Sequence, residues 1–382
     1  MLPLLLAAVT LFSSCAGLNI LDPFGINDDD AFNPLNMNTI KEPAFVDYKV
    51  SRLLYGTLTE KEKQAYRRIY NSVLDHPAKI VIPALAEDEL SRVFLALKFD
   101  NPQILCLKNT YTYYRTESKF YILPEYCHSV EECGRMCGSL IDAAKKICDK
   151  IPARSGEYEK ELYLHDALIE RAEYSDGRNS DTAYGALVDG KAACGGYALA
   201  CKLLFDMAGI QSVAVSGETT DMSGGTVPHM WLAASINNNW YFVDPAWDDP
   251  VGNGDTLRHT YFNVNETELM RTHSGYTLPE AVSCCSDSED YFIKSDMLAS
   301  ENGWEEKLER SLKNIVRLPA HVELRFESAK LLEASSEKLF DRGTLSDLLK
   351  KNTVFGGNIS VSHSTDNDRS VLHIYIRQQT ER

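Results

Sequence analysis

The sequence predicts an α+β fold in which a helix that begins at a cysteine packs on an antiparallel sheet that carries a histidine and an aspartate. From Cys194 onward, apolar residues recur at the i, i+3, i+4 spacing of a helix. Downstream, residues 227–236 and 240–244 read as two strands, and three asparagines at 237–239 join them. Asparagine tolerates positive φ angles, so this pattern predicts a β-hairpin.

The predicted helix places Cys194 in its first turn. There the unpaired N–H groups and the positive end of the helix dipole stabilise a thiolate and lower the pKa of a thiol. Gly195 and Gly196 follow at once, and we expect them to let a substrate carbonyl approach the backbone closely. The alternative for a lone cysteine is a buried structural residue. A basic partner would favour the catalytic interpretation.

The hairpin supplies that partner. With a two-residue loop at 237–238, His229 and Asp244 lie on the same face as diagonal neighbours, roughly 7–8 Å apart along the backbone. Asp244 could then accept a proton from one imidazole nitrogen and leave the other nitrogen facing Cys194. The order of cysteine, histidine and aspartate therefore predicts nucleophilic catalysis.

These residues occur in sequence blocks that resemble the core of the transglutaminase-like superfamily, the papain-type cysteine enzymes with bacterial secreted and lipoprotein members. The blocks are Gly-Lys-Ala-Ala-Cys-Gly-Gly-Tyr-Ala at 190–198, His-Met-Trp at 229–231, Trp-Tyr-Phe-Val-Asp at 240–244 and Trp-Asp-Asp at 247–249. The sequence departs from the family pattern at Leu232, where asparagine is common, and at Pro245-Ala246. Neither departure removes a catalytic group, and the resemblance covers residues 45–300 with falling specificity at both ends.

The resemblance implies a papain-like fold in which Cys194 is the nucleophile, His229 the general base and acid, and Asp244 the group that orients His229. It implies acyl transfer or hydrolysis at amide bonds of an extracellular protein or peptide, through a thioester. The Cys194 N–H is the expected oxyanion donor, and Tyr184, ten residues upstream, is the candidate second donor. This chemistry needs no metal or organic cofactor. The competing hypothesis is a catalytically silent surface protein that uses the fold to bind a partner.

Charge excludes some partners. The chain of 382 residues has a formal net charge of −16, which disfavours nucleic acid and an anionic membrane surface, because both would repel it. We expect a protein or peptide substrate instead. The sequence leaves the substrate's identity and the oligomeric state open.

The first 17 residues read as an export signal. An apolar run at 2–12 precedes small residues and Cys15, an arrangement that resembles a bacterial lipobox with Cys15 as the lipid-bearing residue. We expect a lipid-anchored extracellular protein, with plain secretion as the alternative. Residues 18–44 are polar and lack periodicity, which predicts a linker.

The rest of the chain divides into three predicted parts: an N-terminal α+β portion at 45–155, the catalytic core at 156–300 and a C-terminal α+β module at 301–382. Helical spacing places Cys133 and Cys137 on one buried helix face. For the C-terminal module we expect helices at 304–316 and 328–351 and strands at 321–326, 358–363 and 371–377. Its strands show no catalytic constellation, so we interpret it as a packing or partner-binding module.

Overall fold

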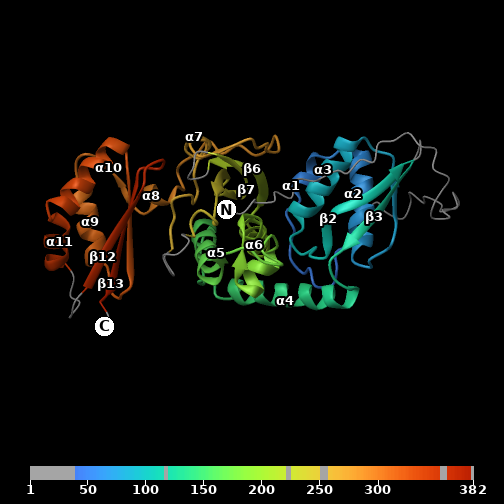
Figure 1. Cartoon of the computed structure of the whole chain (residues 1–382), viewed down its shortest axis with the longest axis horizontal. Coiled ribbons are helices and arrows are strands. Elements are labelled where there is room, and N and C mark those ends of the chain that lie inside the picture. Colours follow the sequence, from blue (N-terminus) through green and yellow to red (C-terminus); the bar gives the residue numbers. More distant parts are fainter. Residues whose placement is uncertain (1–38, 116–118, 221–224, 250–256, 353–358, 380–382) are drawn as a thin grey trace.

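The computed structural model describes residues 39–115, 119–220, 225–249, 257–352 and 359–379. Figure 1 shows three parts in a row, with the N-terminal elements at one end and the C-terminal elements at the other. Helices combine with mainly antiparallel sheets, which confirms the predicted α+β class. The predicted signal with Cys15, and most of the predicted linker, lie outside the described residues. Within them, no helix combines the length and hydropathy that a membrane crossing requires.

The N-terminal part packs helices on a small antiparallel sheet with strand order β1-β3-β2. A capping box opens α2, because the Thr59 and Glu62 side chains each bond to the backbone of the other residue. β1 was not predicted, since a run of four residues is too short to show a period. The elements are α1 (Leu53–Thr57), α2 (Glu60–Val73), β1 (Ile80–Pro83), α3 (Glu87–Asp100), β2 (Leu107–Arg115) and β3 (Lys119–Tyr126).

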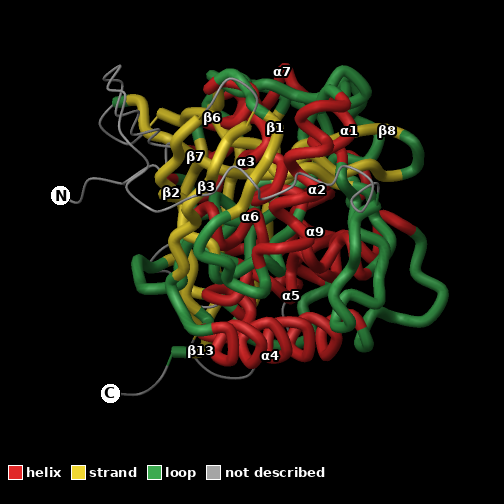
Figure 2. Tube along the Cα trace, turned by 90° about the vertical axis from the view of Figure 1, so that its right-hand side faces the viewer, coloured by secondary structure: helices red, strands yellow, loops and turns green. Residues whose placement is uncertain are grey.

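The central part surrounds α6, which begins at Cys194 as predicted and is buried through Asp206. A helix buried on all sides marks the middle of a core. α6 packs against β7 of the antiparallel sheet β8-β7-β6-β9, and α4 runs along one edge below α5 (Figure 2). The elements are α4 (Val130–Cys148), α5 (Glu157–Arg171), β4 (Glu173–Tyr174), η2 (Gly185–Asp189), β5 (Lys191–Ala192), α6 (Cys194–Met207), β6 (Ser212–Thr220), β7 (Thr226–Ile236), β8 (Asn239–Val243), α7 (Glu266–Leu269), β9 (His273–Ser274) and α8 (Tyr291–Lys294).

The predicted hairpin is formed by β7 and β8. Leu232 lies opposite Val243, which is the register that a two-residue loop requires. Asn237 and Asn238 take φ angles of 50° and 68°, in the left-handed region that asparagine tolerates best after glycine. Local turn chemistry therefore fixes which hairpin residues share a face.

The C-terminal part packs helices on a sheet of strand order β10-β11-β13-β12. The single helix expected at 328–351 is wrong, because the chain turns at Gly343, whose φ is 76°. The sequence pattern hid this break, since Leu332, Leu339 and Leu345 are buried on both sides of it. The elements are β10 (Leu298–Ala299), α9 (Trp304–Lys313), β11 (Ala320–Phe326), α10 (Ala329–Ser336), η3 (Glu337–Asp341), α11 (Thr344–Asn352), β12 (Ile359–Asp366) and β13 (Val371–Gln378).

Cys133 and Cys137 of α4 are both buried, as the helical spacing indicates. Cys133 forms a disulfide with Cys106, whereas Cys137 is a free thiol. Residues of α4 also join the same apolar cluster as α6. The helix thus ties the predicted N-terminal portion to the predicted core, and the domain limits given above stay a prediction.

Candidate active site

The first turn of α6 presents Cys194. No side chain caps this helix start at Ala193, so the N–H groups of the first turn remain available to a negative charge. The predicted role of the two glycines needs a correction. A Cβ on Gly196 would lie 2.1 Å from the Ser180 carbonyl oxygen, so this glycine is required by packing and not by a substrate. Gly195, by contrast, lines a cavity.

Asp244 holds His229 as the hairpin register predicts. The His229 Nε2 and Asp244 Oδ2 atoms are 2.6 Å apart, and the two residues are 5% and 0% exposed. The other carboxylate oxygen of Asp244 accepts the backbone N–H groups of Ala246 and Trp247. Asp244 is therefore fixed by its own turn and cannot rotate away from the imidazole.

The charge on His229 is stabilised by this arrangement. Burial by itself would lower the pKa of His229, but the Asp244 charge and hydrogen bond, together with a hydrogen bond to Cys194, raise it to about 10. Burial would raise the pKa of Asp244, and the His229 charge reverses this effect and lowers it. Since Nε2 is held by Asp244, Nδ1 is the nitrogen that can exchange a proton with Cys194.

A second histidine, which sequence reasoning missed, also binds Asp244. His273 Nε2 lies 3.0 Å from Asp244 Oδ2, and its Nδ1 lies 2.8 Å from Thr272 Oγ1. Burial lowers the pKa of His273, although the Asp244 interactions oppose this, so the ring is neutral and donates its Nε2 proton to Asp244. No local signal could have found it, because β9 is a two-residue strand paired to the edge of β6.

A cavity of about 690 Å³ opens over Cys194 and His229. Part of its wall comes from the N-terminal part, where α3 contributes Phe94 and Lys98. Burial lowers the pKa of Lys98, while Asp181 and Cys194 raise it by their charge, so the ammonium lies within electrostatic range of the thiol. Tyr184 is not among the residues that line the cavity, and its predicted oxyanion role stays a prediction.

Comparison with known proteins finds one matching family. Residues 145–245 match the family model of the transglutaminase-like superfamily. This segment is similar to a transglutaminase-like core. It is shorter than the 45–300 span that the sequence resemblance suggested, but it contains Cys194, His229 and Asp244. No curated protein matches the chain.

Three solved structures resemble parts of the chain. A transglutaminase crystal structure has 15% identity and a TM-score of 0.27 and covers 46% of this chain and 52% of its own. A candidate cysteine protease from Cytophaga hutchinsonii has 16% identity and a TM-score of 0.24, with coverages of 36% and 61%. The periplasmic domain of TgpA from Pseudomonas aeruginosa, bound to ethylmercury, has 13% identity and a TM-score of 0.18, with coverages of 44% and 71%.

These likenesses have limits. The chain spans 52% of the transglutaminase and 61% of the candidate protease, and all three TM-scores lie below 0.5. The activities of those proteins are therefore not transferred to this one by similarity. The chemistry of the site follows from the contacts of Cys194, His229 and Asp244 within the matched segment.

Proposed function

We propose that the protein is a thiol-dependent enzyme that transfers or hydrolyses the acyl group of an amide through a thioester at Cys194. The observation that supports this most is the combination of Cys194 at a helix N-terminus with a His229 imidazole that Asp244 holds at 2.6 Å. Both residues line the same cavity. A helix N-terminus and an adjacent imidazolium each stabilise a thiolate.

In the first half-reaction, the Cys194 thiolate attacks the carbonyl carbon of the amide, and the carbonyl oxygen takes up the displaced electron pair. The backbone N–H of Cys194, in the first turn of α6, is placed to donate to this oxyanion. When the C–N bond breaks, His229 gives its proton to the leaving amine. The products are a thioester on Cys194 and a neutral His229.

In the second half-reaction, an amine or water attacks the thioester, and His229 takes the proton of the attacking group. The thiolate leaves and the thiolate–imidazolium pair is restored. Asp244 remains ionised throughout, because the His229 charge and the hydrogen bonds from His229 and His273 outweigh the effect of burial and keep the pKa of Asp244 low. An amine acceptor gives transamidation, whereas water gives hydrolysis.

The cavity favours an enzyme over a silent binding protein. An occluded cysteine was the observation that would have supported the binding hypothesis, but Cys194 lines an accessible cavity together with its histidine partner. The cavity also has apolar walls at Phe94 and Leu199, next to Lys98 and Glu218. Such a mixture suits a peptide segment that carries an apolar side chain, and we propose an extracellular protein or peptide substrate.

Trapping the acyl-enzyme tests the proposal. The purified chain is incubated with a library of amide-bearing peptides and a biotinylated primary amine, and amine incorporation and peptide cleavage are followed by mass spectrometry. We expect turnover in the wild type and none in Cys194→Ala. If Cys194→Ala and the wild type behave alike, or if no peptide or protein forms an adduct on Cys194, the binding hypothesis is the better account.

We also propose export and lipid attachment at Cys15, which the lipobox-like sequence at 12–15 supports. A lipid anchor would supply the membrane affinity that an acidic chain lacks. Cys15→Ala should therefore move the protein from the membrane fraction to the medium, as measured by fractionation and immunoblotting. An unchanged distribution would exclude Cys15 as the anchor.

A further inference from the structure

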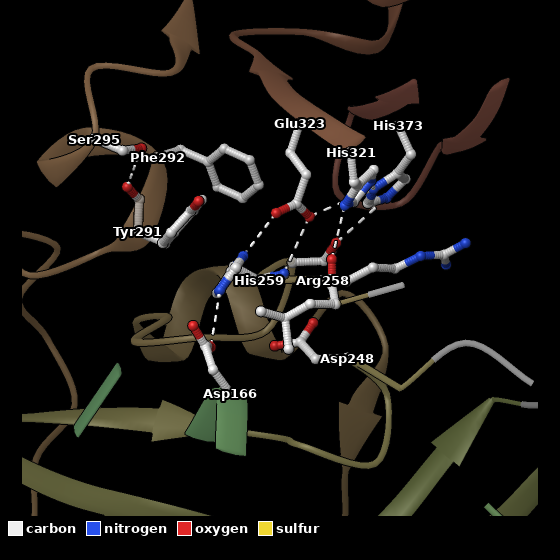
Figure 3. A network of polar contacts seen from close by, with 12 residues as sticks. Asp166, Asp248, Arg258, His259, Tyr291, Phe292, Ser295, His321, Glu323 and His373 are labelled. Carbon is white, nitrogen blue, oxygen red and sulfur yellow. Dashed lines mark hydrogen bonds and ion pairs between the residues drawn. The ribbon is translucent and has the colours of Figure 1, made fainter. Parts of the chain in front are cut away.

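The sheet of the C-terminal part carries a cluster of two histidines and a glutamate. Glu323 on β11 lies opposite His373 on β13, and His321 precedes Glu323 by two residues, so all three side chains lie on one face of the sheet. Their ligand atoms lie within 4.8 Å of one another. His373 and Glu323 are 1% and 5% exposed. Figure 3 shows the three side chains gathered at the end of the sheet that faces the central part.

Three atoms of this cluster that face one another, His321 Nε2, His373 Nδ1 and Glu323 Oε1, have the spacing of metal ligands; we call them the inner atoms. His321 Nε2 is 3.2 Å from His373 Nδ1, and His373 Nδ1 is 3.4 Å from Glu323 Oε1. Two ligands held at 2.0–2.1 Å from a tetrahedral zinc ion are separated by about 3.3 Å. One position between these three atoms would therefore satisfy all of them without a large movement.

The remaining polar atom of each side chain, here called the outer atom, faces a hydrogen-bonding partner, as is usual for metal-binding histidines and carboxylates. His321 Nδ1 donates to the carbonyl oxygen of Leu257 at 2.7 Å, which leaves Nε2 with a free electron pair. His373 Nε2 faces Thr260 Oγ1 at 3.5 Å. Glu323 Oε2 accepts from His259 Nδ1 at 2.7 Å. Such outer hydrogen bonds fix the orientation of ligating histidines and carboxylates.

From these distances we propose that His321, Glu323 and His373 bind a zinc ion. A set of two imidazoles and one carboxylate suits zinc, and water would complete the tetrahedron. The site is independent of the chemistry at Cys194, which needs no metal. The sequence of this module shows no such constellation, because the cluster forms only when β11 and β13 pair.

The ion would join the C-terminal part to the central part. Leu257, His259 and Thr260, which hold the outer atoms, lie in one segment of the central part. The next residue, Tyr261, accepts the backbone N–H of Asp244 and donates its own to Asp248 Oδ1. A metal on the sheet would thus fix the segment that supports the catalytic hairpin.

The competing explanation is a metal-free cluster that hydrogen bonds hold together, in which His373 Nδ1 donates to His321 Nε2. The Arg258 guanidinium, which donates to Tyr375 Oη at 2.6 Å, is a nearby positive charge that disfavours a cation. The two explanations differ in whether the protein takes up one equivalent of zinc at these residues.

Zinc titration distinguishes them. The full chain carrying Cys194→Ser, which removes the thiol of the candidate active site, is stripped with EDTA and titrated with ZnCl₂ by calorimetry. We expect one equivalent to bind, and an affinity at least about 100-fold weaker in His321→Asn and in His373→Asn. His363→Asn is the matched control, because His363 is an exposed histidine of the same sheet, and it should bind like the parent. No bound zinc, or equal binding by all variants, would overturn the proposal.

A spectroscopic measurement covers the case in which these variants fail to fold. Cobalt(II) bound to the Cys194→Ser protein should show the visible bands of a tetrahedral site without a thiolate charge-transfer band, since the ligands are nitrogen and oxygen. A thiolate band would assign the metal to cysteines, and an octahedral spectrum would exclude the proposed geometry. Either result contradicts the site.

Discussion

The molecule contains two buried clusters in which a carboxylate is shared by two histidines. In the central part, Asp244 is bonded to His229 and His273. Between the central and C-terminal parts, Glu323 contacts His259 and His373. Burial opposes ionisation of both carboxylates, and in both the histidine partners outweigh it and lower the carboxyl pKa. The pairing chemistry is thus nearly the same.

The surroundings differ. The Asp244 cluster meets a thiol at a helix N-terminus and a cavity with Lys98 in its wall. The Glu323 cluster is bonded to no cysteine among the described residues, and residues of two parts of the chain enclose it. A buried histidine–carboxylate pair is therefore not enough to indicate catalysis. A nucleophile and an accessible face decide between a reactive and a structural cluster.

The largest difference should come from the nucleophile. Cys194→Ala should lower kcat/KM by at least about 10⁴, because a unit that works through a covalent step loses most of its rate with any member. Cys201→Ala, seven residues further along the same helix and fully buried, is the matched control and should keep kcat/KM within about threefold. Steady-state assays with a substrate that the trapping experiment has identified measure kcat/KM for both variants. Equal losses would show that helix packing, and not the thiol, is responsible.

Neutralising the two carboxylates sharpens the comparison. Asp244→Asn should lower turnover by about 10²–10⁴ with the fold intact, because the amide can present an N–H and favour the wrong imidazole tautomer. Glu323→Gln should leave turnover within about threefold and lower the free energy of unfolding by about 3 kcal/mol, since it removes one of the two carboxylates, Glu323 and Asp166, that hold the buried His259 charge. Kinetics and urea denaturation separate the two effects. A catalytic loss in Glu323→Gln comparable to that in Asp244→Asn would remove the distinction.

His273 is expected to act as a positioning residue. His273→Gln should lower kcat about tenfold, because a hydrogen bond to a charged group contributes roughly 1.5–3 kcal/mol. Since His273 helps to keep the pKa of Asp244 low, the acid limb of the pH–rate profile should also move to higher pH. A purely structural role would lower stability without moving that limb.

The smallest effect is a pH dependence of stability that the two clusters share. The pKa values of His229 and His259 are each raised to about 10, because the neighbouring carboxylates outweigh burial. The unfolded value is about 6.5, so each histidine contributes stability that is fully present below about pH 6.5 and is lost as the pH rises through about 10. Urea denaturation at pH 6.5 and pH 9.5 should show a smaller pH-dependent loss in His259→Gln than in the wild type. An unchanged loss would contradict the assigned charge on His259.

The parts of the site that the sequence predicted depend on local patterns. Helical spacing after Cys194 predicts that this cysteine lies in the first turn of a helix. The asparagine turn at 237–238 predicts that His229 and Asp244 share a face of the hairpin. Neither prediction needs knowledge of the tertiary fold. The parts that it missed depend on distant pairing. His273 reaches Asp244 across 29 positions, and His321 reaches His373 across 52. The chain turns at Gly343, but the apolar residues keep their helical spacing on both sides of this glycine. The spacing of side chains therefore does not reveal the break in the helix.

Alkylation tests the proposed nucleophilic role of Cys194 most directly. Cys127 and Cys285 are exposed free thiols, whereas Cys194 is only 8% exposed, so accessibility and reactivity predict opposite orders. We expect iodoacetamide at mildly acidic pH to label Cys194 first, because ordinary thiols with a pKa of about 8.5 stay protonated there. His229→Ala should move the onset of labelling to higher pH. Labelling of Cys127 and Cys285 before Cys194 in the native protein would contradict the account.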